Sequence, residues 1–176
     1  GAKIPIYEPA GHMICDIGGG TTEVSVISLG GMVTTSSIRV GGDRFDRDIV
    51  KHIKNVHNLN IGQQTAERLK IQIGNVAPDK TIEKMELKGA DAITGLPRRI
   101  EIDSVEVREA LKEAVTQIIE EIKKAIGQTP PEMSSDIIDR GIVMTGGGSM
   151  LKGLPKLISK ETNVPVILVE NPLECV

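Results

Sequence analysis

Two triple-glycine runs, each directly after a short apolar stretch, limit the folds that are open to this chain. The first lies in DIGGGTTE, residues 16–23, and the second in GIVMTGGGS, residues 141–149. Because glycine has no Cβ, such a loop lets backbone N–H groups approach an anion closely. One run alone is typical of a simple turn. Two runs in one chain favour a site that binds phosphate groups.

The first glycine run lies between two predicted strands, not between a strand and a helix. Met13–Cys15 precedes it, and the alternating, β-branched segment Val24–Leu29 follows it. A P-loop is excluded because no glycine run ends in Gly-Lys-Ser/Thr, and a dinucleotide fingerprint needs a helix after the glycines. The pattern predicts a β-hairpin over a phosphate chain, with Asp16 placed to hold a hydrated Mg²⁺ and with hydroxyl donors at Thr21 and Thr22.

Hydrophobic periodicity predicts an α/β chain in which a charged middle segment is inserted between two outer parts. The outer parts are residues 1–40 and 103–176, and the inserted small subdomain is residues 41–102. Helices are expected over residues 45–56, 65–73, 103–126 and 150–161. Strands are expected as a meander within residues 14–40 and over residues 82–87, 99–102, 141–145 and 165–169.

Particular residues mark the expected ends of these helices. Thr65 is the predicted N-cap of the second helix, and Asp103 with Glu106 resembles a capping box at the start of the longest one. Pro130–Pro131 is expected to prevent any continuation of that helix. The second glycine run is expected to open the helix that begins near Met150. Its free N–H groups and dipole suit a phosphate, and its flat backbone suits a purine face.

Composition excludes several classes of function. The net charge is −3, and the only aromatic residues are Tyr7 and Phe45, which argues against a nucleic-acid surface. No apolar run approaches the roughly 20 residues that span a bilayer, and the N-terminus does not resemble a signal peptide. We therefore expect a cytoplasmic protein.

The cysteines and histidines do not predict a metal site. Cys15 and Cys175 lack a CxxC spacing and are expected to be inert thiols. His52 and His57 lie on one predicted helix, where their spacing separates their directions by about 140° and prevents them from sharing a metal ion. His12 lies outside that helix, so surface or packing roles are expected for all three histidines.

Five separated motifs resemble the actin-like ATPases, most closely the bacterial actin MreB family. In chain order they are DIGGGTTEVSVISLGG, SIRVGGDRFDRDIV, TAERLKIQIG, TGLPRRIEI and DRGIVMTGGGSMLKGLP. The resemblance extends over essentially the whole chain. It implies an α/β actin-like (ribonuclease H-like) domain with a small inserted α+β subdomain, and it implies ATP and Mg²⁺ as cofactors.

On the phosphate side, the resemblance implies a role for each matching residue. Asp16 is expected to position Mg²⁺ through water, and Thr22 to help sense the γ-phosphate, so these two are the candidate catalytic residues. The residues that are expected to wrap the β- and γ-phosphates are Gly18, Gly19, Gly20 and Thr21.

On the nucleoside side, the resemblance implies that Glu67 and Lys70 contact the ribose and the purine. The alternative, without any ligand, is that these two residues form a solvated ion pair between positions i and i+3 of one helix. The residues that are expected to receive the adenosine are Gly146, Gly147, Gly148 and Ser149.

The resemblance covers only the second half of an MreB-type protein. IPIYEPAG resembles the linker into that half, and NPLECV lies before the family's closing helix. Hydrolysis needs the γ-phosphate clamped from both sides, so we expect weak or undetectable ATPase activity from this chain alone.

The expected partners follow from the same resemblance. They are other copies of the protein in head-to-tail filaments beneath the inner membrane, together with cell-shape and cell-wall synthesis proteins. Neither nucleic acid nor direct membrane contact is expected of this half.

Two other readings stay open from the sequence. The nucleotide-binding lobe of an Hsp70-type chaperone shares a GGGT hairpin, but Thr22-Glu23 stands where that family has Phe-Asp. A sugar or acetate kinase of the same superfamily needs a carboxylate base for its substrate, and none is evident here.

Overall fold

The structure, a computed structural model, describes residues 7–169. Cys175 and the NPLECV segment lie outside the described residues. The strands are β1 (His12–Ile17), β2 (Thr22–Ser28), β3 (Gly31–Ile38), β4 (Leu59–Asn60), β5 (Lys84–Asp91), β6 (Pro97–Asp103), β7 (Ile142–Thr145) and β8 (Val166–Leu168). The helices are α1 (Gly42–His57), α2 (Gln63–Ile73), α3 (Ser104–Gly127), α4 (Pro131–Arg140) and α5 (Leu154–Thr162), with a short 3₁₀ helix, η1 (Gly147–Met150).

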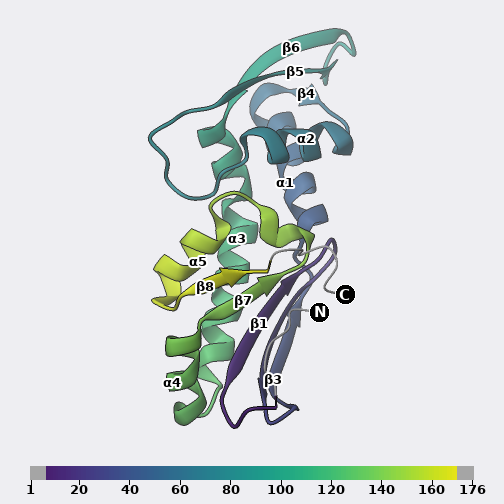
Figure 1. Cartoon of the computed structure of the whole chain (residues 1–176). Helices are drawn as coiled ribbons and strands as arrows, with labels where there is room; N and C mark the ends of the chain where they lie inside the picture. Colours follow the sequence, from purple (N-terminus) through teal and green to yellow (C-terminus); the bar gives the residue numbers. More distant parts are fainter. Residues whose placement is uncertain (1–6, 170–176) are drawn as a thin grey trace.

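The larger sheet has five strands in the order β3-β2-β1-β7-β8. Strands β1, β2 and β3 form an antiparallel meander, as predicted, whereas β7 and β8 run parallel to β1. Figure 1 shows this sheet in the lower part of the molecule, with both glycine loops at its upper edge. The shared edge follows from the parallel pairing of β1 with β7, because parallel strands end on the same side.

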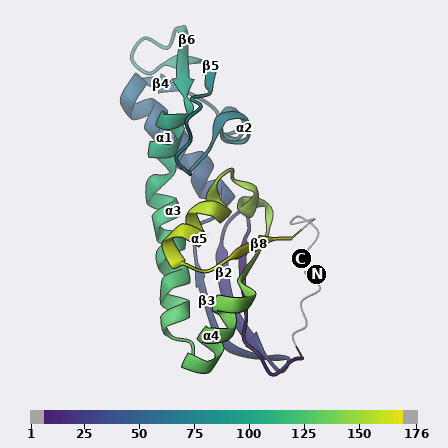
Figure 2. The same cartoon turned by 60° about the vertical axis from the view of Figure 1, so that its left-hand side comes forward.

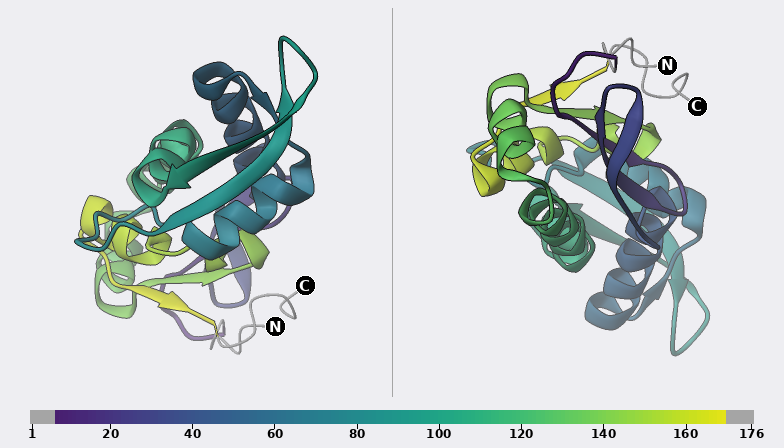
Figure 3. Two further views of the ribbon diagram at one scale, coloured as in Figure 1. Left: turned by 90° about the horizontal axis from the view of Figure 1, so that it is seen from above. Right: turned by 90° about the horizontal axis from the view of Figure 1, so that it is seen from below.

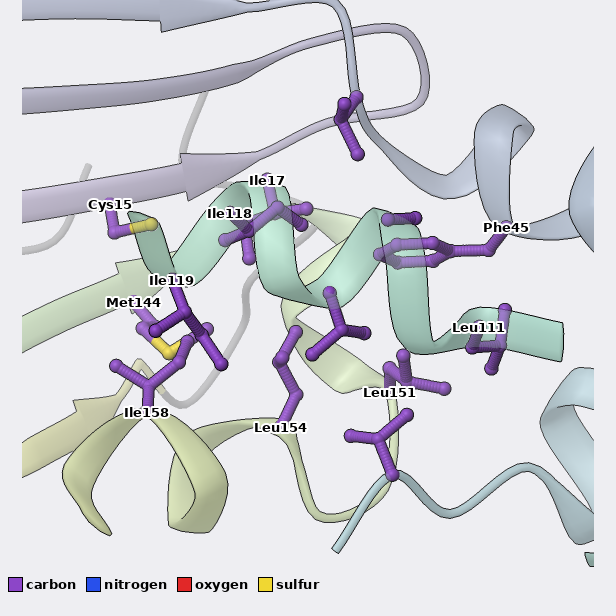
Figure 4. Close-up of a cluster of buried hydrophobic side chains, with 14 of the residues drawn as sticks. Cys15, Ile17, Phe45, Leu111, Ile118, Ile119, Met144, Leu151, Leu154 and Ile158 are labelled. Carbon is purple, nitrogen blue, oxygen red and sulfur yellow. The ribbon is translucent and has the colours of Figure 1, made fainter. Parts of the chain in front are cut away.

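One face of the large sheet carries the hydrophobic core. Met13, Cys15 and Ile17 alternate along β1 and are fully buried, whereas Ile14 and Asp16 point to the opposite, partly exposed face. Figure 2 shows α3, α4 and α5 gathered on the buried side. Figure 4 shows part of this core, where side chains of α3 pack against those of the strands and other helices; the labelled residues are Cys15, Ile17, Phe45, Leu111, Ile118, Ile119, Met144, Leu151, Leu154 and Ile158.

A smaller sheet occupies the other end of the molecule. Its strand order is β4-β5-β6, and all its pairs are antiparallel. Helices α1 and α2 pack beside it, and α1 also contacts α3. The tip of the β5–β6 hairpin projects from this end (Figure 3). Both hairpin strands are longer than the sequence pattern predicted.

The start of α3 confirms half of the predicted capping box. The Asp103 carboxylate accepts a hydrogen bond of 2.9 Å from the Glu106 backbone N–H. The Glu106 carboxylate does not return to Asp103; its Oε1 pairs with His52 at 3.1 Å and with His57 at 2.5 Å. The two imidazoles, predicted to point apart, therefore meet at one carboxylate and join α1 to α3.

Two other boundary predictions were wrong. Helix α2 begins at Gln63 after Gly62, so Thr65 lies inside its first turn and is not the N-cap. Helix α4 was missed altogether, because Pro130–Pro131 was read only as a stop. Pro131 instead occupies the first turn of a new helix, where a missing N–H costs nothing. No helix within residues 7–169 is long and apolar enough to cross a membrane.

Candidate functional site

A cleft of about 570 Å³ lies between the glycine-loop edge of the larger sheet and the helices α1 and α2. The turn between β1 and β2, the first turn of α1, one face of α2 and the segment around η1 form its walls. The lining residues that the sequence analysis also selected are Gly18, Gly19, Glu67, Lys70, Gly147 and Gly148. The fold thus brings four of the five family-like motifs to one cavity.

The two glycine loops pack directly against each other. Asp16 at the end of β1 is opposite Thr145 at the end of β7. Gly146 has φ +82, and a Cβ there would collide with the Asp16 carboxylate and the Ile17 carbonyl. This position needs glycine for both its backbone conformation and its close approach. The loops are therefore two parts of one site.

The first turn of α1 is fixed to the first glycine loop. The Gly42 N–H donates to the Gly18 carbonyl at 2.9 Å, and the Asp43 N–H donates to the Gly19 carbonyl at 2.8 Å. A Cβ at Gly41 would lie 2.5 Å from the Gly18 oxygen. The positive end of the α1 dipole therefore faces the loop, which favours an anion there.

Neither packing within the chain nor backbone conformation requires glycine at the three glycines of the first loop. A Cβ at Gly20 would meet nothing within 4 Å, and the nearest atoms to a Cβ at Gly18 and Gly19 lie 3.6 and 3.5 Å away. None of the three has a positive φ. Three positions that could carry a side chain but do not are suited to close approach by something outside the chain.

Asp16 lies at the end of β1 on the face of the sheet that the helices leave open. Partial burial, and to a smaller extent the nearby charge of Glu23, raise the pKa of its carboxyl group. No group of three or more His, Cys, Asp or Glu side chains within residues 7–169 is arranged to hold a metal ion. A single carboxylate still fits Mg²⁺, which keeps most of its water and takes its other ligands from phosphates.

Thr21 and Thr22 differ in exposure although they are neighbours. Thr21 is exposed at the turn, and its carbonyl accepts a hydrogen bond of 2.9 Å from the Gly18 N–H. Thr22 is fully buried, and its hydroxyl donates to the Val40 carbonyl at 2.7 Å. The structure therefore brings Thr21 to the loop surface but leaves the Thr22 hydroxyl engaged inside the protein.

The second glycine loop does not open an α-helix, contrary to the prediction. Gly147–Met150 forms the short η1 turn, and α5 begins only at Leu154, after Gly153. Ser149 is fully buried, and its hydroxyl donates to the Gly146 carbonyl at 2.6 Å. Ser149 therefore stabilises the second glycine loop from inside. The helix N-terminus whose dipole favours an anion is that of α1, which faces the first glycine loop.

Glu67 and Lys70 both line the cleft, but they do not pair with each other. The Lys70 ammonium lies 2.7 Å from Oδ1 of Asp46 on α1 and 3.5 Å from the Gly42 carbonyl. The solvated i,i+3 ion pair considered from the sequence is therefore not formed. Burial raises the pKa of Asp46, and Lys70 opposes that rise.

The sequence analysis did not select several other cleft residues, of which four bear on ligand binding. Asp43 lies in the first turn of α1 and Asp46 in the turn after it, whereas Ile71 and Met150 come from α2 and η1. Ile71 is 62% exposed and Met150 is 56% exposed, so both offer apolar surface to a flat ring. The available signals were an acidic residue directly after the Gly41–Gly42 pair and a methionine directly after the second glycine loop.

The model of one protein family, MreB/Mbl protein, matches residues 1–176. The chain belongs to the MreB/Mbl family. It is 49% identical to the cell shape-determining protein Mbl of Bacillus subtilis and 46% identical to MreB of Escherichia coli, over 176 residues in each case. All of this chain is covered, but only 53% and 51% of those proteins. The chain therefore spans about half the length of the relatives it matches.

Solved structures give the same family and an actin-like fold. MreB5 of Spiroplasma citri, in crystals with AMPPNP, superposes with a TM-score of 0.95 at 38% identity, over 99% of this chain and 53% of that protein. The same protein with ADP matches equally well. MamK in a double helical filament matches with a TM-score of 0.75 at 25% identity, over 93% of this chain and 50% of that protein. The MreB/Mbl match does not favour the Hsp70-type reading.

Proposed function

We propose that this MreB/Mbl chain binds Mg·ATP between its two glycine loops and serves as one half of a filament-forming, cell shape-determining protein. The observation that carries the proposal is the first glycine loop, in which neither packing nor backbone conformation requires glycine at residues 18–20. Open space over three glycines beside a helix N-terminus is suited to phosphate groups.

Every predicted site residue except Thr22, whose buried hydroxyl donates to the Val40 carbonyl, has a place in this proposal. Gly18, Gly19, Gly20 and Thr21 hold the β- and γ-phosphates through backbone and hydroxyl donors, and Asp16 holds Mg²⁺ through water. Gly146, Gly147 and Gly148 receive the adenosine, and Ser149 keeps that loop in shape. Glu67 and Lys70 contact the sugar and base. Two nucleotide complexes of MreB5, one with AMPPNP and one with ADP, support the nucleotide-binding part of the proposal.

We also propose that the chain consists of two subdomains. Residues 1–40 and 103–176 form the nucleotide-binding subdomain, and residues 41–102 form the small inserted one. We propose that hydrolysis requires the longer protein, in which a second half closes over the γ-phosphate from the open, Asp16-bearing side. With groups on only one side of the γ-phosphate, the attacking water is poorly aligned. This chain alone is therefore expected to hydrolyse ATP slowly.

Self-association in head-to-tail filaments is supported by apolar residues at the ends of an elongated molecule. At the β5–β6 tip, Ile93 is 81% exposed and Leu96 is 66% exposed. The Asp91 carboxylate fixes this tip by accepting hydrogen bonds from the N–H groups of Ile93 and Thr94, at 3.0 and 2.9 Å. Ile138 on α4, at the other end in Figure 1, is 56% exposed. Contacts between unlike surfaces of successive copies generate open filaments.

The cellular part of the proposal rests on the family. We propose filaments in the cytoplasm beneath the inner membrane, where they act with cell-shape and cell-wall synthesis proteins. Mbl and MreB, the relatives described above, carry the description cell shape-determining protein. Neither nucleic acid nor direct membrane contact has a part in the proposed role of this chain.

Calorimetric titration of Mg·ATP into the chain tests nucleotide binding. We expect saturable binding that Gly20→Val weakens at least tenfold, because the added side chain fills the space above the loop. Gly62→Val is the matched control, since a Cβ at Gly62 also meets nothing within 4 Å but lies before α2. A folded chain without ATP binding, or equal affinities of the two variants, contradicts the proposal.

A further inference from the structure

Met150 lies on the wall of the cleft, and more than half of its side chain is exposed. It belongs to η1, and its neighbours on both sides, Ser149 and Leu151, are buried. The backbone therefore presents the Met150 side chain at the surface, between two residues that are anchored in the protein. Ile71 of α2, which is also more than half exposed, lines the same cleft.

The segment that follows Met150 is fastened to the end of α2 that carries Ile71. The Lys152 ammonium donates to the Gln72 carbonyl at 2.7 Å, and the Lys152 carbonyl accepts a hydrogen bond of 3.0 Å from the Val76 N–H. Met150 and Ile71 thus belong to segments that hydrogen bonds hold together. A chemical change at Met150 therefore alters a surface that is in place before any ligand binds.

Met150 differs from the other methionines because it combines exposure with a place in the cleft. The chain has six methionines, all within residues 7–169. Met13 and Met144 are fully buried, and two others are half-buried. Met32 on β3 is 69% exposed but does not belong to the cleft lining. Oxidants in solution reach an exposed thioether more readily than a buried one, so Met32 and Met150 are the two accessible sulfur atoms of this kind.

We propose that Met150 is a modification site, at which oxidation to methionine sulfoxide lowers the affinity of the cleft for ATP. This inference rests on the proposed nucleotide binding and adds a means of regulating it. The oxidant is a hydroperoxide such as hydrogen peroxide. The Met150 sulfur attacks one peroxide oxygen, and an S–O bond forms as the O–O bond breaks. The transferred oxygen gives its proton to the departing hydroxide, which leaves as water, so the sulfur loses two electrons and the peroxide gains them.

A sulfoxide changes what the cleft wall offers to a purine ring. The thioether is apolar and adaptable, whereas the sulfoxide is polar and holds water. A flat ring that packs against Met150 must remove that water, and burying a polar group without a new hydrogen bond is unfavourable. We expect oxidation to weaken ATP binding by about tenfold. Bound ATP in turn covers Met150, so it is expected to slow the oxidation of Met150 but not that of Met32.

The decisive measurement is the ratio of the Mg·ATP dissociation constants after and before treatment with hydrogen peroxide, obtained by calorimetry. A Cys175→Ser background leaves the buried Cys15 as the one thiol, and peptide mass spectrometry identifies the oxidised methionines. The ratio is expected to be about tenfold in this chain and near unity in Met150→Leu, because leucine is not oxidised. Met32→Leu is the matched control, since it removes the more exposed thioether and is expected to keep the tenfold ratio.

Met150→Gln gives a second test, because glutamine is polar and similar in length to methionine. It is expected to bind ATP more weakly than Met150→Leu, and peroxide is expected to change neither affinity. Circular dichroism melting confirms that the treated proteins stay folded.

Several results would overturn the inference and leave the proposed function standing. They are oxidation of Met32 without oxidation of Met150, full ATP affinity of a chain with oxidised Met150, and a tenfold loss that Met150→Leu does not prevent. Equal rates of Met150 oxidation with and without saturating Mg·ATP would also overturn it. Absence of ATP binding by the untreated, folded chain contradicts both the inference and the proposed function.

Discussion

The Thr22 hydroxyl donates a hydrogen bond of 2.7 Å to the Val40 carbonyl. Thr22 begins β2, and Val40 lies between β3 and α1. The bond therefore fastens the segment that leads into α1 to the hairpin that carries the first glycine loop. Thr22 is fully buried and Val40 is 3% exposed. Water therefore cannot reach the Val40 carbonyl to replace the Thr22 hydroxyl if that hydroxyl is removed.

Thr22→Val is expected to lower the free energy of unfolding by about 1 to 3 kcal/mol, because the Val40 carbonyl loses its buried partner. Urea denaturation measures the change. Thr21→Val is the matched control, since the exposed Thr21 hydroxyl bonds to no described residue and its loss leaves the unfolding free energy nearly unchanged. Equal stabilities for the two variants would show that the Thr22 bond is unimportant.

Gly41→Ala is expected to destabilise the protein although Gly41 has an ordinary extended backbone. A Cβ there would lie 2.5 and 2.6 Å from the Gly18 and Gly19 carbonyl oxygens, which belong to backbone and cannot rotate away. The shift costs about 1 to 3 kcal/mol, as in overpacked cores. Gly62→Ala changes the corresponding position before α2, where there is open space. Comparable unfolding curves for both variants would contradict the close approach.

Cys15 is expected to resist alkylation in the native state. Burial, and to a lesser extent Asp16, raises the pKa of its thiol from 9.0 to about 12. Only the thiolate reacts, so at pH 8 the native thiol reacts about a thousandfold more slowly than an unfolded one. A chain with Cys175→Ser, treated with iodoacetamide with and without urea, gives the two rates. Rapid native labelling would mean that β1 opens readily.

Asp16→Asn is expected to change how stability depends on pH. The raised pKa means that, between its ordinary value of 3.8 and the native value, the folded state binds more protons than the unfolded state. Stability therefore falls as pH rises through that window, and the penalty is fully present at neutral pH. The variant is expected to be more stable than the unmodified chain at pH 7 and equal to it near pH 3. Parallel stability curves for the two proteins would argue against the shift.

Asp16→Asn also tests whether Asp16 holds Mg²⁺. Asp16→Asn is expected to abolish the part of ATP affinity that depends on Mg²⁺, because an amide is a poor ligand for a hydrated Mg²⁺ ion. Titration of ATP with Mg²⁺ and with excess chelator separates that part from direct contacts. An undiminished Mg²⁺ effect in the variant would place the ion elsewhere. A gain in stability together with a loss of binding is typical of a functional carboxylate.

Sequence reasoning succeeded where the information was local. The meander of residues 12–38 follows from alternation and from tight turns, and the length of α3 follows from a 3.6-residue stripe that ends at Gly127. It failed where one residue type supports two outcomes. Pro130–Pro131 ends one helix, but it also permits a new one, and the choice of α4 depends on the buried Ile137 and on the bond between the Gly11 N–H and Asp136.

The sequence by itself determined the glycine loops, the alternating core strands and the family motifs, because each depends on residues adjacent along the chain. Only the tertiary structure decided which polar partners meet. Lys70 pairs with Asp46, 24 positions earlier in the chain, and not with its helical neighbour Glu67. The physical reason is that a charge gains more from a partner shielded by the fold than from one in solvent. Periodicity predicts which face of a helix is buried, but it does not predict which charged group lies opposite that face.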